Sequence, residues 1–343
     1  MNRKDFLFSS SSLIVASQTT LIPALPEDDN AFSSLIPPYL KKGDTIGITA
    51  PAGYITLEEI QPAMKLIESW GYKIKVGETI GKKDFTFGGT DDERLDDFQN
   101  MLDDPKVKAI LSARGGYGSI RIVDRLKWDK FKLKPKWIIG FSDLTVIHSF
   151  LNRQFKIASI HSKMCNSFPD DWSKAEPIQI ETIESINKAL SGVKMQYTAT
   201  PNINNRLGSA EGILVGGNLK TLETMSATPS DLITVGKILF VEDTGEYLYS
   251  IDRMFWNLKR TGKLSYLKAL IVGGFKIKTD SDTEDFGKTL EQIVMEKVKN
   301  YKYPVCFDFP VGHQRNNFAL KCGIKHRIEV GGTTVVLNEV QNS

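Results

Sequence analysis

Apolar and polar residues alternate with two different periods along the first half of the chain. Short apolar runs rich in β-branched residues predict buried strands, and longer runs with apolar residues three or four positions apart predict amphipathic helices. The predicted strands are residues 45–50, 72–80, 107–113, 136–142 and 157–164. The predicted helices are residues 56–70, 90–104, 117–126 and 143–154. Because strands and helices take turns, we predict a parallel sheet with helices on both faces, a flavodoxin- or Rossmann-like α/β domain over residues 37–165.

The first predicted helix has recognisable ends. Thr56 is a suitable N-cap, Glu59 stands three residues later as a capping box requires, and Gly71 stops the helix. Ligands of parallel α/β sheets bind beyond the carboxyl ends of the strands. The stretches "ARGGYGS" at 113–119 and "GFSDLT" at 140–145 fall at such ends and are therefore candidate site loops.

The second half of the chain is richer in strands. Residues 166–205 hold one predicted helix within polar, proline-containing sequence and are interpreted as a connector. Beyond it, strands are predicted at residues 210–219, 237–244, 269–275, 304–310, 326–332 and 333–340. Helices are predicted at residues 219–229, 249–262 and 282–300. We therefore predict a second, strand-richer mixed α/β domain over residues 206–340.

Composition is that of an ordinary folded protein. The 343 residues are 41% hydrophobic and 25% charged, which excludes wholesale disorder, and a net charge of only +3 gives no argument for nucleic acid. The lysine-rich stretch at 127–137 is interpreted as a solvated edge strand or loop. Three cysteines without CxxC spacing, and no HExxH motif, give no support for a metal site. We expect buried free thiols, with one disulfide as the alternative in an exported protein.

The first 30 residues differ from the rest. Arg3 and Lys4 precede a short apolar segment diluted by serines and followed by small and polar residues, which is the order of a secretory signal. "RKDFL" also resembles a degenerate twin-arginine signal. We predict an exported, periplasmic protein, with a disordered tail on a cytoplasmic protein as the alternative. The segment is too short and polar to span a membrane stably, and no later segment is apolar enough.

Ser142 lies between a predicted strand and a predicted helix and has two interpretations. It can be a helix N-cap, which is an ordinary use of serine. It can also be a nucleophile on a sharp strand-to-helix turn, which lifts the hydroxyl clear of the sheet and aims free N–H groups at a developing oxyanion. The strict G-x-S-x-G pattern fails, because Leu144 holds the last position. The stretch alone leaves both interpretations open.

The glycine-rich stretch at 113–119 offers a similar choice. Its N–H groups can bind phosphate, but the full G-x-G-x-x-G pattern is lacking, and lysines near Lys136 stand where an acidic ribose partner is expected. The same glycines can instead lie beside Ser142 and supply an oxyanion donor. A nucleotide-dependent α/β enzyme is therefore kept only as an alternative.

A nucleophilic serine needs a base, and the chain has four histidines. His148 lies among apolar residues of a predicted helix, and His326 lies between two basic residues in a strand that we expect to be exposed. His161 closes the fifth predicted strand, whereas His313 lies in a polar loop, where catalytic groups are common. Position therefore favours His313 modestly over His161.

Two carboxylates follow an apolar strand in the second half. Glu242 and Asp243 are costly to bury there without a partner. They are either a solvated strand end or the acceptor that orients a catalytic base. Ser142, Glu242 and His313 follow the chain order nucleophile, acid, base that α/β-hydrolases use.

Seven stretches together resemble the LD-carboxypeptidases of peptidase family S66, which includes muramoyl-tetrapeptide carboxypeptidases and microcin-immunity enzymes. They are "IGITAPAG", "ARGGYGSIRIVDRLKW", "IIGFSDLTVI", "AEGILVGGNLKTLETMSATP", "LFVEDTGEYLYSIDRMFWNL", "ALIVGGF" and "FPVGHQRNN". They occur in the family's order and are spread over most of residues 38–335. Each stretch alone is a weak signal, and their co-occurrence is specific.

The resemblance implies a serine carboxypeptidase that hydrolyses an L,D peptide bond and releases the terminal D-alanine of murein tetrapeptide. It implies Ser142 as nucleophile, Glu242 and His313 as its acid and base, and the backbone N–H groups of Asp143 and Gly116 as the oxyanion hole. It implies no metal or organic cofactor. The expected partner is a peptidoglycan-derived peptide, and a homodimer is usual in the family.

Arg114, Tyr117 and His161 are further candidates for substrate binding. The chain departs from the family at "HSKM", residues 161–164, where many relatives have Gly-Pro-Met, so its leaving-group preference is open. The leader is a second departure, because well-known relatives work in the cytoplasm. A non-catalytic protein that binds cell-wall peptides is the main alternative function.

Overall fold

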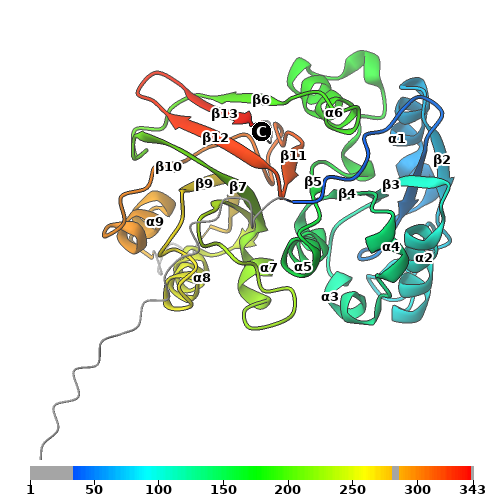
Figure 1. Ribbon diagram of the computed structural model, residues 1–343, viewed down its shortest axis with the longest axis horizontal. Helices are drawn as coiled ribbons and strands as arrows, with labels where there is room; N and C mark the ends of the chain where they lie inside the picture. Colours follow the sequence, from blue (N-terminus) through cyan, green and yellow to red (C-terminus); the bar gives the residue numbers. More distant parts are fainter. Residues whose placement is uncertain (1–33, 280–285, 341–343) are drawn as a thin grey trace, which may run out of the picture. The chain divides into compact units, whose positions relative to one another are not determined.

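The first of two sheets is built from the N-terminal half of the chain (Figure 1). The structure is a computed structural model that describes residues 34–279 and 286–340, so the predicted leader at 1–30 lies outside the described residues. The sheet order is β11-β5-β4-β3-β1-β2. Its five parallel strands are β1 (Thr45–Thr49), β2 (Lys73–Val76), β3 (Val107–Ser112), β4 (Trp137–Gly140) and β5 (Ser159–His161). The predicted parallel sheet is therefore confirmed.

The sixth strand of this sheet comes from the far end of the chain. β11 (Leu320–Cys322) pairs antiparallel with β5, and Leu320 lies opposite His161. Sequence patterning missed this strand, because three residues are too few to show a period. Just after it, the N–H of Gly323 donates to the carbonyl oxygen of Leu214 at 2.7 Å. β11 therefore links the two sheets.

Helices cover both faces of the first sheet, as predicted. They are α1 (Leu57–Ser69), α2 (Asp91–Asp103), α3 (Ser119–Ile122), α4 (Asp129–Leu133), α5 (Thr145–Phe155) and α6 (Pro177–Leu190). α1 and α6 share a core with Ile48 on one face, and α2 and α5 share a core with Ile110 on the other. The capping box predicted from Thr56 and Glu59 begins α1.

Two predictions about this half are wrong. The stretch at 127–137, interpreted as a solvated edge strand or loop, contains α4, and the side chains of Trp128, Phe131 and Trp137 are buried. Alternating lysines suggested an exposed strand, but Trp128 and Phe131 are spaced for one face of a helical turn. The helix predicted at 117–126 is only the single turn α3 followed by a 3-10 turn, Val123–Arg125.

The second sheet has the order β10-β9-β8-β7-β12-β13-β6. Its parallel strands are β7 (Gly208–Asn218), β8 (Ile238–Glu246), β9 (Ala269–Ile277) and β10 (Val305–Cys306). Its antiparallel strands are β12 (Lys325–Val330), β13 (Val335–Glu339) and β6 (Gln196–Ala199). The helices of this half are α7 (Leu219–Thr224), α8 (Leu248–Arg260) and α9 (Leu290–Val298). The chain is thus a mixed α/β protein with two sheets, as predicted.

Some details of this half differ from the prediction. β6 lies within the stretch interpreted as a connector. His326 is fully buried rather than exposed, because β12 is paired on both sides and His326 lies on its inner face. In the described part of the chain, no helix is both long and apolar enough to span a bilayer.

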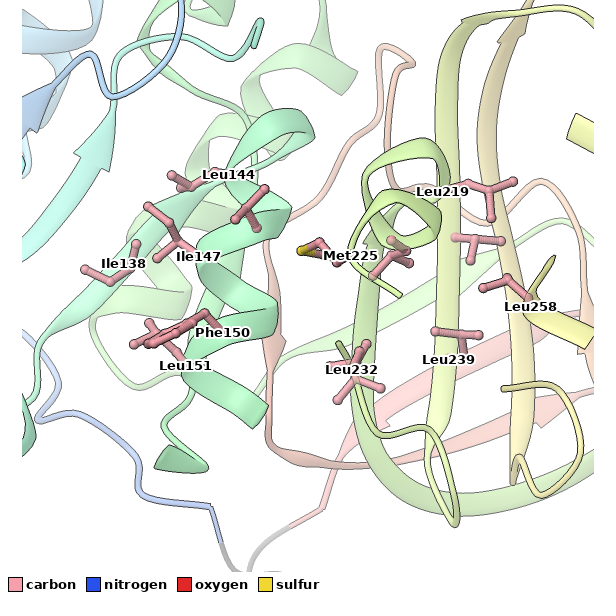
Figure 2. Packing of buried hydrophobic residues seen from close by; sticks show 14 of the residues in the cluster. Ile138, Leu144, Ile147, Phe150, Leu151, Leu219, Met225, Leu232, Leu239 and Leu258 are labelled. Atoms are coloured by element: carbon pink, nitrogen blue, oxygen red, sulfur yellow. The ribbon is translucent and has the colours of Figure 1, made fainter. Parts of the chain in front are cut away.

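One hydrophobic core runs from the first sheet to the second. Leu144, just before α5, and Ile147 and Phe150, within α5, belong to the same core cluster as Met225 and Leu232, which follow α7 (Figure 2). α5 and α7 are in contact, and the chain from residue 34 onward is a single compact unit. The predicted domain limits therefore stay a prediction, since one core includes residues of both sheets.

Arg94 of α2 is a fully buried cation that the sequence analysis did not single out. Its guanidinium donates to the carbonyl oxygens of Pro51 at 2.6 Å, Gly118 at 3.0 Å and Gly89 at 3.2 Å, and it pairs with Asp91. Pro51 follows β1, and Gly118 lies in the glycine-rich loop after β3. Arg94 therefore joins two loops at the carboxyl end of the first sheet.

Replacing Arg94 by Met should lower the free energy of unfolding by about 3–5 kcal/mol, because three carbonyl groups lose a buried donor and Asp91 loses its partner. Denaturant unfolding measures the change. The matched control is Arg125→Met, which removes only an exposed ion pair with Asp92 and should change stability by less than about 1 kcal/mol. Equal losses in the two variants would contradict the anchoring role of Arg94.

Candidate active site

Ser142 lies at a sharp turn between β4 and α5. After Gly140 the backbone at Phe141 is extended, and Ser142 begins a 3-10 turn, Ser142–Leu144, directly before α5. The φ of Ser142 is 62°, a left-handed value that strains a non-glycine residue by about 1–3 kcal/mol. Within the described chain no side chain caps this turn or α5, so the N-cap interpretation of Ser142 is wrong. The strand–turn–helix outline of a nucleophile elbow is what remains.

The glycine-rich loop after β3 lies against Ser142. A Cβ on Gly115 would lie 3.1 Å from the Cβ of Ser142 and 3.2 Å from its Oγ, so a side chain there would crowd the hydroxyl. Gly116, which the resemblance implies as an oxyanion donor, is exposed and has a φ of 112°. The loop is therefore next to the hydroxyl, and the donor role of Gly116 stays a prediction.

The carboxylate of Asp143 is buried under the same loop. Its Oδ2 accepts a hydrogen bond from the N–H of Ser119 at 2.8 Å, at the start of α3. Burial raises the pKa of Asp143, and hydrogen bonds from Ser119 and Gly118 partly oppose the rise. A carboxylate thus occupies the place where a phosphate loop would hold its phosphate. This arrangement argues against the nucleotide-binding interpretation of the loop.

Glu242 and His313 form a buried pair. Glu242 lies in the middle of β8 and is fully buried, and its Oε2 lies 2.5 Å from Nδ1 of His313. Because a carboxylate oxygen only accepts, Nδ1 carries the proton, and in the neutral ring Nε2 is left as an acceptor. The side chain of His313 is 15% exposed, so the ring still reaches open space. The pair therefore has the geometry of a base that is oriented by a carboxylate.

Gly312 makes this pair possible. Its φ is 98°, and a Cβ at this position would lie 2.6 Å from the Cγ of Glu242 and 2.8 Å from its Oε2. The N–H of Gly312 donates to Oδ1 of the buried Asn317 at 2.8 Å, which fixes the loop. Any side chain at position 312 would therefore displace Glu242 or the loop.

Ser142 and His313 line the same cavity, which has a volume of about 440 Å³. Ser142 follows a strand of the first sheet, and His313 lies in the loop between β10 and β11. The ring of Phe141, beside the serine, lies with its centroid 4.9 Å from that of the imidazole. The described hydrogen bonds include Glu242 to His313 but none from Ser142 to His313. The structure thus brings the serine and the histidine to one space without bonding them directly.

The three residues expected to bind substrate lie at different depths. Arg114 lines the cavity and donates to the carbonyl oxygen of Tyr54 at 3.0 Å. Tyr117 is 55% exposed. His161 does not line the cavity, because it is fully buried behind Phe141, and burial lowers its pKa well below the usual value.

Sequence reasoning missed three cations in the cavity lining, Lys163, Lys276 and Arg315. Lys163 lies in the "HSKM" stretch, so the departure from the family pattern was a signal that this segment borders the site. The other two gave no signal, because a lysine late in a strand and an arginine in a loop are ordinary surface residues in sequence.

Metal-binding clusters and cysteine pairing can both be checked among the described residues. Among them, no group of three or more His, Cys, Asp or Glu side chains is arranged to hold a metal ion. Cys165, Cys306 and Cys322 are buried free thiols, as expected.

Two family models match the chain, one in each half. The LD-carboxypeptidase N-terminal domain matches residues 46–162, and the LD-carboxypeptidase C-terminal domain matches residues 211–328. The chain is 31% identical to the "Probable murein peptide carboxypeptidase" of Bacillus subtilis over 308 residues, 88% of this chain and 93% of that protein. It is 26% identical to the microcin C7 self-immunity protein MccF of Escherichia coli, over 88% of this chain and 94% of that protein.

A solved structure agrees with these sequence relatives. The crystal structure of muramoyltetrapeptide carboxypeptidase from Oxalobacter formigenes matches with a TM-score of 0.76 and 27% identity, over 87% of this chain and 99% of that chain. The resemblance drawn from the sequence motifs is confirmed. The chain therefore belongs to the LD-carboxypeptidase family and is a hydrolase of the carboxypeptidase class.

Proposed function

We propose that this protein is a serine carboxypeptidase that cuts an L,D peptide bond and releases D-alanine from murein tetrapeptide. One observation carries the proposal: Ser142 and His313 line the same cavity, and the buried Glu242 is bonded to that histidine. The names of the relatives, a murein peptide carboxypeptidase and a muramoyltetrapeptide carboxypeptidase, support the substrate class.

In the first half of the reaction, Oγ of Ser142 attacks the carbonyl carbon of the scissile bond. Nε2 of His313 takes the hydroxyl proton as the new C–O bond forms, and Glu242 stabilises the resulting imidazolium through Nδ1. The N–H groups of Asp143 and Gly116 are proposed to bind the oxyanion, and such a donor is worth about 3 kcal/mol in comparable sites. Ser142, whose backbone is left-handed, lines the cavity, which supports its role as the nucleophile.

In the second half, the tetrahedral intermediate collapses and the C–N bond breaks. His313 gives its proton to the departing amine, which leaves as the free D-amino acid, and the shortened peptide stays as an ester on Ser142. Water then attacks the ester while Nε2 takes a proton from it. Breakage of the ester C–O bond returns that proton to Ser142 and frees the peptide.

Two alternative functions can be compared with the geometry of the same site. A binding protein without turnover would keep the cavity but release no product. A nucleotide-dependent enzyme would need the glycine-rich loop for phosphate, where the carboxylate of Asp143 already accepts the N–H of Ser119. In the proposed peptidase the glycine-rich loop supplies an oxyanion donor, and this role is compatible with the position of the Asp143 carboxylate.

We also propose that the protein is exported and works in the periplasm. The order of charge, apolar and polar residues in positions 1–30 supports export to the periplasm, and family resemblance supports a homodimer. Cell fractionation should find a shortened protein in the periplasmic fraction. A full-length protein confined to the cytoplasm would contradict export without touching the proposed chemistry.

The chemistry is tested by incubating the protein with murein tetrapeptide and measuring D-alanine release by mass spectrometry. Ser142→Ala should lower the rate by at least roughly 10³-fold, because the nucleophile is lost. Ser167→Ala, which changes another serine of the same cavity lining, should retain activity. No release by the unaltered protein would favour the binding alternative, and an active Ser142→Ala variant would place the nucleophile elsewhere.

Gly312→Ala should lower the rate of D-alanine release by roughly 100-fold, because a small displacement of the base or its carboxylate has effects of this size. The control is Gly236→Ala, since Gly236 has a φ of 71° but open space around its Cβ position. It should lose only about 1–2 kcal/mol of stability and keep its activity. Equal activity of the two variants would show that the close approach to Glu242 is unimportant.

A further inference from the structure

Lys163 is a cavity residue that is hydrogen-bonded to the histidine loop, the segment between β10 and β11 that carries His313. It follows β5 by two residues, lines the cavity, and donates from Nζ to the carbonyl oxygen of Gln314 at 2.7 Å. The same Nζ lies 5.9 Å from the ring centroid of Phe141, which precedes the serine. The ammonium therefore lies between the backbone beside His313 and the residue beside Ser142.

The cavity is lined by positive charge. Arg114, Lys163, Lys276 and Arg315 line it, and none of the described lining residues is Asp or Glu. Arg315 is largely exposed and pairs with Glu176 at 2.5 Å. A positively charged lining favours an anionic ligand. Both arginines of the lining already have partners, because Arg114 donates to a carbonyl oxygen and Arg315 pairs with a carboxylate.

We propose that Lys163 binds the C-terminal carboxylate of the peptide substrate and so determines that the enzyme removes a terminal residue. This inference rests on the proposed function, in which His313 protonates the departing amine. In that amine the carboxylate carbon is two bonds from the nitrogen, roughly 2.5 Å away. The carboxylate must therefore lie on the His313 side of the cavity, which is where Lys163 is fixed by its bond to Gln314. A lysine has three donors, and one is used by that carbonyl, which leaves two for a carboxylate.

The surroundings of Lys163 make its charge sensitive to an incoming anion. The pKa of Lys163 is lowered to about 8, mainly by burial and also by the charge of Lys276 of β9, while Glu242 of β8 opposes the shift. His313 and Arg315 face it from the loop after β10, as the other cavity-lining groups on that side. Because lysine is charged below its pKa, the ammonium is present at neutral pH and is lost as the pH rises through about 8.

The test compares murein tetrapeptide with the same peptide ending in D-alaninamide, which lacks only the terminal charge. The unaltered enzyme should prefer the acid by roughly 10- to 100-fold in kcat/KM, the size of one charged hydrogen bond. Lys163→Met should bring this ratio close to one, whatever the two separate rates become. Lys163→Arg should keep most of the preference, and Lys276→Met, which changes the neighbouring cavity lysine, should keep it as well.

A preference for the acid that persists in Lys163→Met, or that disappears only in Lys276→Met, would overturn the inference while leaving the peptidase proposal intact. An unaltered enzyme that cleaves both peptides equally well would also overturn the role of Lys163 and leave the peptidase proposal intact. If it cleaves neither, the proposed function itself fails, and this inference fails with it.

A second readout needs no loss-of-charge variant and so does not depend on the folding of Lys163→Met. In the unaltered enzyme, the preference for the acid should fall between about pH 7 and 9 as the ammonium deprotonates. In Lys163→Arg it should stay constant, because arginine keeps its charge. A pH-independent preference in the unaltered enzyme would contradict the assignment.

Discussion

The hydrogen bond between Nδ1 of His313 and Oε2 of Glu242 spans 2.5 Å in a place where the carboxylate is fully buried. A buried carboxylate without partners would be strongly disfavoured, so the imidazole is part of what allows Glu242 to lie there. In return, the carboxylate selects the ring tautomer and leaves Nε2 facing away from it. Gly312 is the constraint on which this bond depends, because any side chain would fill the space that Glu242 occupies.

The chemistry also depends on how the two sheets are joined. Ser142 is carried by the first sheet and Glu242 by the second, so neither half holds the whole proposed site. Three features fix the junction: β11 paired with β5, the shared core around α5 and α7, and a hydrogen bond at 3.1 Å from the N–H of Asn218 to Oγ1 of Thr145. Thr145 follows the serine turn and Asn218 ends β7, so this last bond ties the strand end directly to the turn. A displacement at this junction would separate serine from histidine without altering either residue.

Much of this arrangement could be predicted from the sequence where local physics is decisive. The capping box of Thr56 and Glu59 and the strand–helix alternation depend on residues close together in the chain, and both are present. Ser142 could be suspected from its position between a strand and a helix, although only the structure excludes a capping role. His313 and Glu242, 71 positions apart, could be linked only through family resemblance, because nothing local indicates that they meet.

The residues that sequence reasoning missed have their roles set by contacts distant in sequence. Lys163 has its role through a hydrogen bond to Gln314, which is distant in sequence, and Arg94 lies in an acidic amphipathic helix whose sequence does not indicate a buried cation. His161 and His326 were misjudged because burial of a strand depends on its neighbours in the sheet, which come from other parts of the chain. The misread lysine-rich stretch at 127–137 shows the same limit, since its aromatic residues are buried by a core that the stretch itself does not specify.

We propose that the pair of His313 and Glu242 makes the hydroxyl of Ser142 nucleophilic. The most direct measurement is covalent labelling with a fluorophosphonate that reacts with activated serines, with the modified residue identified by peptide mass spectrometry. We expect one adduct, on Ser142, that forms far more slowly in His313→Ala and in Glu242→Gln. Labelling of a different serine, or labelling of Ser142 at an unchanged rate in both variants, would contradict it.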